Sequence, residues 1–238
     1  MSIDLGLLLL TAASIGFIHT LLGPDHYLPF VAMSSARGWT TRKTLWITSL
    51  CGLGHVAGSV AIGAVGIGIG VSLHELQWLE ALRGDVAAWL LTGFGLAYLA
   101  WGLKKSWRSR PHAHEHVHPD GTYHLHEHGH EGGHLHAHVD ARRARSITPW
   151  ALFVIFILGP CEPLVPLLMY PASQHSWWGL TLVVMTFGAV TIATMLTVVY
   201  LGNRGLEHLP LDTAERYSHA LAGAALSLCG LGIVFMGL

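Results

Sequence analysis

The chain has 238 residues, of which 52% are hydrophobic and only 11% carry a charge. About a quarter of the residues of an average soluble domain are charged, so this composition argues against a soluble enzyme or nucleic-acid-binding domain. We therefore expect an integral membrane protein without enzymatic activity.

Six apolar stretches approach the length needed to cross the hydrocarbon core of a bilayer. They cover residues 5–31, 45–71, 86–101, 149–168, 180–201 and 221–238, and the third is the shortest. The first stretch lacks the basic region of a secretory signal, so we interpret it as a retained span. The sequence thus predicts an all-α membrane protein with six transmembrane helices.

Lysine and arginine are distributed unevenly between the loops. Twelve of the 13 basic residues fall in the first, third and fifth loops, and only Arg83 falls on the other side. The positive-inside rule then predicts cytoplasmic odd-numbered loops and both termini outside, in a membrane that we take to be a bacterial inner membrane.

The first and fourth spans share a pattern. The first reads HTLLGPDHYLPF from residue 19, and the fourth reads FILGPCEPLVPLL from residue 156. Proline removes a backbone donor and glycine tolerates unusual dihedrals, so each Gly-Pro predicts an interrupted helix. The two patterns open two sets of three spans. Because three is an odd number, the halves form a predicted 3+3 inverted repeat: residues 1–107 and 148–238, joined by a loop at 108–147.

Interrupted segments at matching positions of inverted halves indicate a transporter's binding site. Asp25 and Glu162 follow the two Gly-Pro pairs, and we interpret them as the only acids placed well inside spans. An intramembrane charge is costly and is therefore usually functional. The candidate metal ligands are Asp25, His26, His55, Glu162, Cys161 and His19. For each break alone, a Pro-kinked helix without a ligand is the alternative.

The loop at 108–147 is rich in histidine, a composition typical of metal binding. Eleven of the 18 histidines lie here: His112, His114, His116, His118, His124, His126, His128, His130, His134, His136 and His138. Prolines and glycines predict a disordered chelating loop. Three matches to H-E-x-x-H, at residues 114–118, 126–130 and 130–134, arise from the repetition of His and Glu. That motif indicates a protease only on a helix.

Together, HTLLGPDH, the GLGH of the second span, LGPCEP and the histidine-rich loop resemble the nickel/cobalt transporters. This group includes nickel–cobalt permeases, NicO-type exporters and urease-accessory-type membrane proteins. The resemblance implies metal recognition by His19, Asp25, His26 and His55. The permease signature has four residues between the first histidine and Asp-His, whereas this chain has five. On a continuous helix, the extra residue turns His19 by about 100°.

We therefore expect a secondary transporter for a divalent transition-metal cation, Ni²⁺ or Co²⁺, with Zn²⁺ as a further candidate. Its expected partners are membrane lipid and metal ions, with no nucleic acid and no prosthetic group. The chain has no Walker-type motif, so an ion gradient or the membrane potential is the expected energy source. A thiol–disulfide electron conduit of the cytochrome-maturation type and a non-transporting metal-binding or urease-maturation protein are the alternatives.

Overall fold

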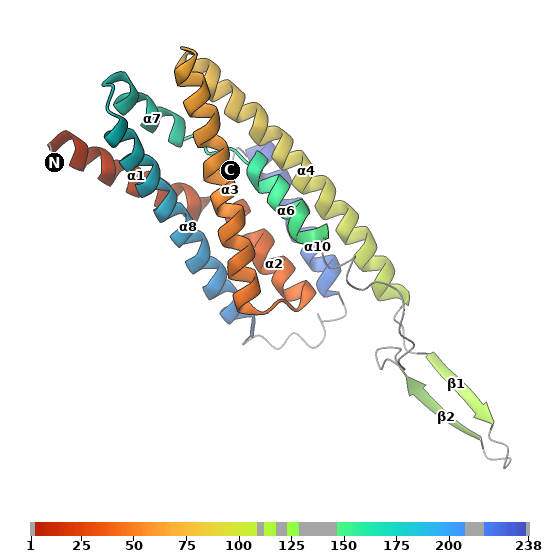
Figure 1. Cartoon of the computed structure of the whole chain (residues 1–238). Helices are drawn as coiled ribbons and strands as arrows, with labels where there is room; N and C mark the ends of the chain where they lie inside the picture. The colour runs from red at the N-terminus through yellow and green to blue at the C-terminus, as the bar shows by residue number, and fades with distance from the viewer. Residues whose placement is uncertain (1–2, 109–111, 118–122, 129–146, 208–216, 237–238) are drawn as a thin grey trace.

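The computed structural model describes residues 3–108, 112–117, 123–128, 147–207 and 217–236. Five of its helices are long and apolar enough to cross a membrane. They are α1 (Ile3–Leu22), α3 (Thr41–Gly68), α4 (Leu73–Arg108), α8 (Trp177–Glu207) and α10 (Ser218–Met236). Together with shorter helices they form one elongated bundle, which is consistent with an all-α integral membrane protein (Figure 1).

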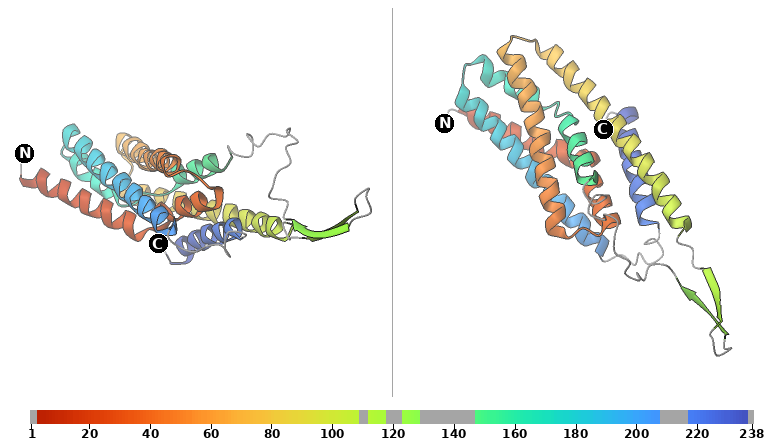
Figure 2. Two further views of the ribbon diagram at one scale, coloured as in Figure 1. Left: turned by 90° about the horizontal axis from the view of Figure 1, so that it is seen from below. Right: turned by 45° about the vertical axis from the view of Figure 1, so that its right-hand side comes forward.

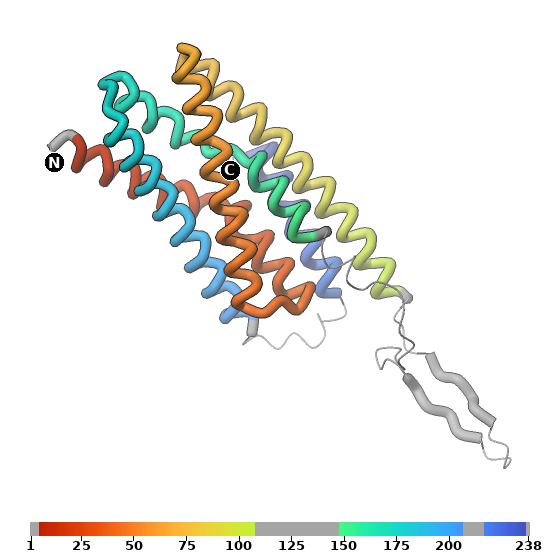
Figure 3. Tube along the Cα trace, in the orientation of Figure 1, coloured from red at the N-terminus to blue at the C-terminus, as the bar shows by residue number. Residues whose placement is uncertain are grey.

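Both predicted interruptions are present. The first span is divided into α1, the short 3₁₀ helix η1 (Pro24–His26) and α2 (Leu28–Arg37). The fourth is divided into α6 (Ile147–Leu158) and α7 (Leu164–Ser173). The chain changes direction at each break, as the trace in Figure 3 shows. The two Gly-Pro pairs therefore end helices inside the predicted spans.

Local sequence explains where several helices begin and end. The Thr40 hydroxyl accepts a hydrogen bond from the backbone of Lys43 at the start of α3. Ser72 and Glu75 form a reciprocal capping box before α4, with the Ser72 amide donating to the Glu75 carboxylate over 3.0 Å. Gly38 ends α2 at φ 57°, the left-handed conformation that glycine adopts without steric cost.

Helix α4 is longer than the sequence predicted. We expected a span at residues 86–101, but the helix has 36 residues, so it is about 54 Å long. Polar residues in the first half of α4, among them Glu80 and Arg83, lower the local hydropathy. The search for apolar stretches therefore missed this part of the helix. We expected Arg83 to lie in a loop. It lies instead within α4, and only 10% of its side chain is exposed.

Small residues allow α4 and α10 to lie side by side, as both views in Figure 2 show. A Cβ added to Gly223 in α10 would collide with the backbone nitrogen of Leu99 in α4. Close backbone approach through small residues is a common way for helices to associate in membranes. This pair forms one wall of the bundle, and α1 packs against α8 elsewhere.

Part of the histidine-rich loop forms two short strands. Strands β1 (His112–Val117) and β2 (Tyr123–His128) pair antiparallel, with His114 opposite His126. We expected this loop to be disordered, and its remaining histidines lie outside the described residues. The first two H-E-x-x-H matches begin on these strands and not on a helix.

Candidate metal centre

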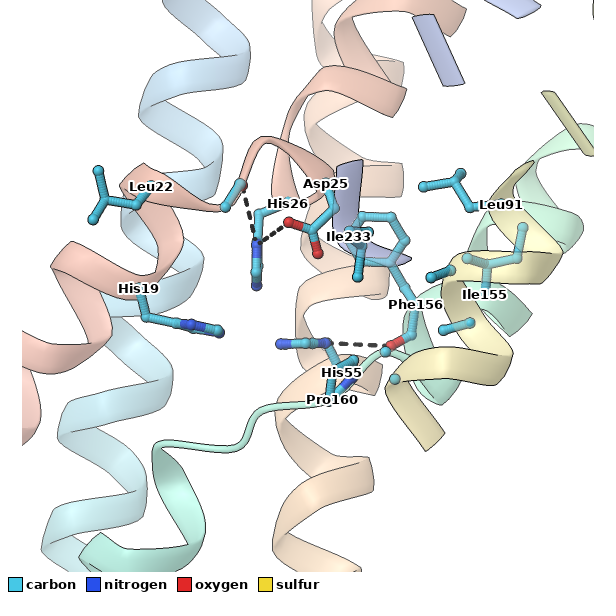
Figure 4. A pocket seen from close by; sticks show the side chains of 15 residues that line it. His19, Leu22, Asp25, His26, His55, Leu91, Ile155, Phe156, Pro160 and Ile233 are labelled. Carbon is cyan, nitrogen blue, oxygen red and sulfur yellow. Dashed lines mark hydrogen bonds and ion pairs between the residues drawn. The ribbon is translucent and has the colours of Figure 1, made fainter. Parts of the chain in front are cut away.

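Three histidines from different segments meet at the first break. His19 lies near the end of α1, His26 ends η1, and His55 lies in the middle of α3. The ring centroids of His19 and His26 are 4.8 Å apart, and those of His26 and His55 are 5.0 Å apart. One nitrogen from each ring lies within 4.8 Å of the others. Figure 4 shows the three rings turned toward a common point.

The Gly23-Pro24 break makes this meeting possible. Because α1 ends at Leu22 and the next residues form a 3₁₀ turn, the angular relation of a continuous helix no longer applies between His19 and His26. The fifth intervening residue thus does not turn His19 away from the group. The sequence predicted the break, but only the folded chain shows that it places the two rings together.

The other ring nitrogen of two histidines is held by backbone oxygens. His26 Nδ1 lies 3.2 Å from the carbonyl oxygen of Gly23, and His55 Nδ1 lies 3.4 Å from that of Phe156. A carbonyl oxygen can only accept a hydrogen bond, so Nδ1 carries the proton in both rings. In the neutral imidazole, the Nε2 lone pair is then free to bind a metal.

The inward-facing nitrogens have no protein partner. The Nε2 atoms of His19, His26 and His55 are all buried and make no hydrogen bond. Burying a polar atom without a partner is unfavourable, so native proteins usually satisfy such atoms. Three such atoms at one point indicate a site for an electrophile, and a cation that imidazole binds well fits this site.

Asp25 is hydrogen-bonded to one of the three histidines. Its Oδ1 accepts a hydrogen bond from His26 Nδ1 over 3.1 Å, and 24% of its side chain is exposed. A carboxylate on the far nitrogen of a metal-binding histidine orients the ring and makes it more basic. The structure therefore supports an orienting role for Asp25, which does not belong to the group of converging ligand atoms.

Glu162 and Cys161 lie apart from this group. Glu162 is exposed at the α6–α7 break, and Cys161 is fully buried there with an exposed fraction of 0%. The structure thus joins three of the six predicted intramembrane ligands, with Asp25 beside them. The pairing of Glu162 with Asp25 across one ion stays a prediction without a contact to support it.

A pocket of about 330 Å³ surrounds the three histidines. One water molecule needs roughly 10–15 Å³ by this kind of measure, so a cation with several waters fits. Gly23 of the first break and Gly159 and Pro160 of the second all line the pocket. Its remaining wall is largely apolar, with Leu91 of α4 and side chains from α6 and α10. The two interrupted segments therefore face the same space.

A second polar group was missed by the sequence analysis. Glu80, Arg83 and Ser59 form a hydrogen-bonded cluster beside the α6–α7 break. We expected only Asp25 and Glu162 to be acids deep within spans, and this was wrong because Glu80 has an exposed fraction of 0%. The three-residue spacing of Glu80 and Arg83, which suits an ion pair on one helix face, was the available signal.

All three cysteines are free and buried. Cys51 packs in the apolar cluster around Phe30, whereas Cys161 packs in a separate cluster around Phe187. This separation gives no support to a Cys51–Cys161 disulfide, the feature on which the electron-conduit alternative depends.

Comparison with known proteins adds no relative. No protein-family model, no curated protein and no solved structure matches the chain.

Proposed function

We propose that the chain is a permease for a divalent transition-metal cation, with Ni²⁺ or Co²⁺ as its cargo. The observation that carries this proposal is the convergence of three buried, unpartnered Nε2 atoms on one pocket. Neutral imidazoles with a carboxylate behind them suit borderline metals such as nickel and zinc. The resemblance of HTLLGPDH and the histidine-rich loop to nickel/cobalt transporters favours nickel and cobalt within that class.

The two helix breaks support transport over static metal storage. Transporters commonly place their substrate where discontinuous helices of two inverted halves meet near the bilayer midplane. Gly23 and Gly159 line the same pocket from separate interrupted segments, and His55 lies at the middle of α3. We infer that α6 and α7 together form the sixth crossing and that the two halves rock about this pocket.

The remaining assignments of this proposal follow from the sequence. The odd-numbered loops lie in the cytoplasm, and the histidine-rich loop collects or buffers metal there. Without Arg83, which lies within α4, the short connection between α3 and α4 holds no basic residue. This agrees with the proposed orientation, in which that connection lies outside the cytoplasm.

Metal flux into proteoliposomes tests this function. The full-length chain should move Ni²⁺ or Co²⁺ across the bilayer, and His26→Ala should reduce the flux to that of protein-free vesicles. His74→Ala, at an exposed histidine of α4, is the matched control and should leave flux unchanged. Wild-type protein that binds metal but gives no flux in either direction would make it a non-transporting metal-binding protein.

A further inference from the structure

The second break is held together by charged side chains of α4. Arg83 Nη2 donates to the carbonyl oxygen of Gly159 over 2.8 Å, and Glu80 Oε2 accepts from the amide of Cys161 over 3.1 Å. A break inside a membrane frees backbone groups that the protein itself must satisfy. The ion pair satisfies one carbonyl and one amide of the interrupted segment.

The pair uses only part of its bonding capacity. Glu80 Oε2 also accepts from Arg83 and from the Ser59 hydroxyl, each over 2.9 Å. Glu80 Oε1 and Arg83 Nε are buried and have no partner. Partly satisfied charged groups in a low-dielectric interior are costly. The carboxylate therefore has a free oxygen for a further ligand, in a part of the chain where ionisable residues are usually functional.

This cluster is the immediate neighbour of the histidines. Ser59 lies four residues after His55, so both side chains occupy one face of α3 with their Cβ atoms about 5–6 Å apart. A Cβ built on Gly159 would lie 3.2 Å from His55 Nδ1, and the Gly159 carbonyl binds Arg83. The histidines and the cluster around Arg83 are thus separated by one turn of α3, and Gly159 contacts both groups.

The donors around Arg83 suit the same class of cation. Glu80 offers a carboxylate and Ser59 offers a hydroxyl. Cys161 adds a fully buried thiol on a residue whose backbone amide donates to the same Glu80 carboxylate. Carboxylate and thiolate together bind borderline divalent metals. The guanidinium of Arg83 provides the positive charge of this group and forms an ion pair with Glu80.

We propose that Glu80, Cys161 and Ser59 form a second station for the transported cation, which the Arg83 guanidinium occupies while the metal is on the histidines. This inference rests on the proposed function. The ion moves one turn along α3, Arg83 withdraws, and the Cys161 thiol releases its proton to solvent as it binds. The divalent cation, one carboxylate and one thiolate are then neutral together, and the net charge of the whole cluster rises by one because the displaced Arg83 keeps its charge.

Titration of the detergent-purified full chain with Co²⁺ tests the station. A cobalt–thiolate bond gives a charge-transfer band in the near ultraviolet that imidazole ligands do not give, and the histidine-rich loop contains no cysteine. Wild-type protein should show visible cobalt bands from its histidines without this ultraviolet band. Arg83→Gln removes the competing charge but keeps a donor for Gly159, so it should gain the band.

Two matched controls identify the ligands. Arg83→Gln combined with Cys161→Ser should lose the band, and Arg83→Gln combined with Glu80→Gln should need more Co²⁺ to reach it. Arg83→Lys keeps the charge and should resemble wild type. A folded Arg83→Gln protein without the band overturns the proposal, and so does a wild-type protein that already shows it.

A second measurement avoids changing Arg83. Cys161→Ser alone should slow Co²⁺ flux in proteoliposomes while leaving the visible bands of the histidine site and their midpoint unchanged. Unchanged flux would contradict the second station. Those visible bands, and their loss in His26→Ala, report on the histidine site separately, so failure of the station and failure of the proposed function are distinguishable.

Discussion

Replacing Asp25 by asparagine distinguishes two models of the site. In the structure Asp25 orients His26, whereas the sequence suggested that Asp25 and Glu162 bind the ion together. Asp25 holds His26 through one hydrogen bond of 3.1 Å, and His26 lies between the other two histidines. A hydrogen bond to a charged group contributes about 1.5–3 kcal/mol and a neutral one about 0.5–1.5 kcal/mol. Asparagine keeps an acceptor but loses the charge, so the expected loss is about 1–1.5 kcal/mol, or roughly tenfold in affinity.

The assay is competition between a chelator and the detergent-purified protein for Ni²⁺. All variants should carry asparagine at the eleven loop histidines, so that only the intramembrane site is measured. Glu162→Gln is the matched control because Glu162 is an exposed acid outside the converging group. Equal losses in Asp25→Asn and Glu162→Gln would refute the orienting role of Asp25 and restore the paired-carboxylate site. If neither variant loses affinity for Ni²⁺, neither carboxylate takes part in metal binding.

Replacing the eleven histidines within residues 112–138 by asparagine should lower the number of metal ions bound per chain, measured by equilibrium dialysis, while flux persists. Complete loss of flux in well-expressed protein would place the loop in the ion path. Gly223→Leu should lower the thermal unfolding temperature because a Cβ at this position would collide with the backbone of α4, whereas Gly205→Ala has open space and should not. A similar unfolding temperature for both would show that α4 and α10 do not pack closely. A reporter fused after Arg108 should be cytoplasmic and one after Leu238 external, and the reverse pattern would overturn the orientation.

The two helix breaks could be predicted because their causes are local. Gly-Pro disturbs the helix wherever it occurs, so Gly23 and Gly159 could be read directly from the chain. His19 was harder to place, because its position depends on how far the chain turns after Leu22. The sequence indicated the right residue types, and the folded break determined which of them meet.

Glu80 and its partners could not be predicted in the same way. The pairing of Glu80 with Arg83 on one helix is local, but their bonds to Gly159 and Cys161 join residues about eighty positions apart. A search for apolar windows also misses the part of a helix whose charged side chains are buried inside the bundle. The acid expected after the second Gly-Pro was Glu162, whereas the buried acid against that break comes from α4.

The position of a bound metal ion tests the central claim most directly. Crystals of the full chain grown with Ni²⁺ and measured at the nickel absorption edge would locate the ion by its anomalous scattering. We predict a peak bonded to the Nε2 atoms of His19, His26 and His55, at a distance near the roughly 2.0–2.1 Å of zinc–imidazole bonds. Nickel bound only to the histidine-rich loop, with no peak between these three rings, would contradict the account.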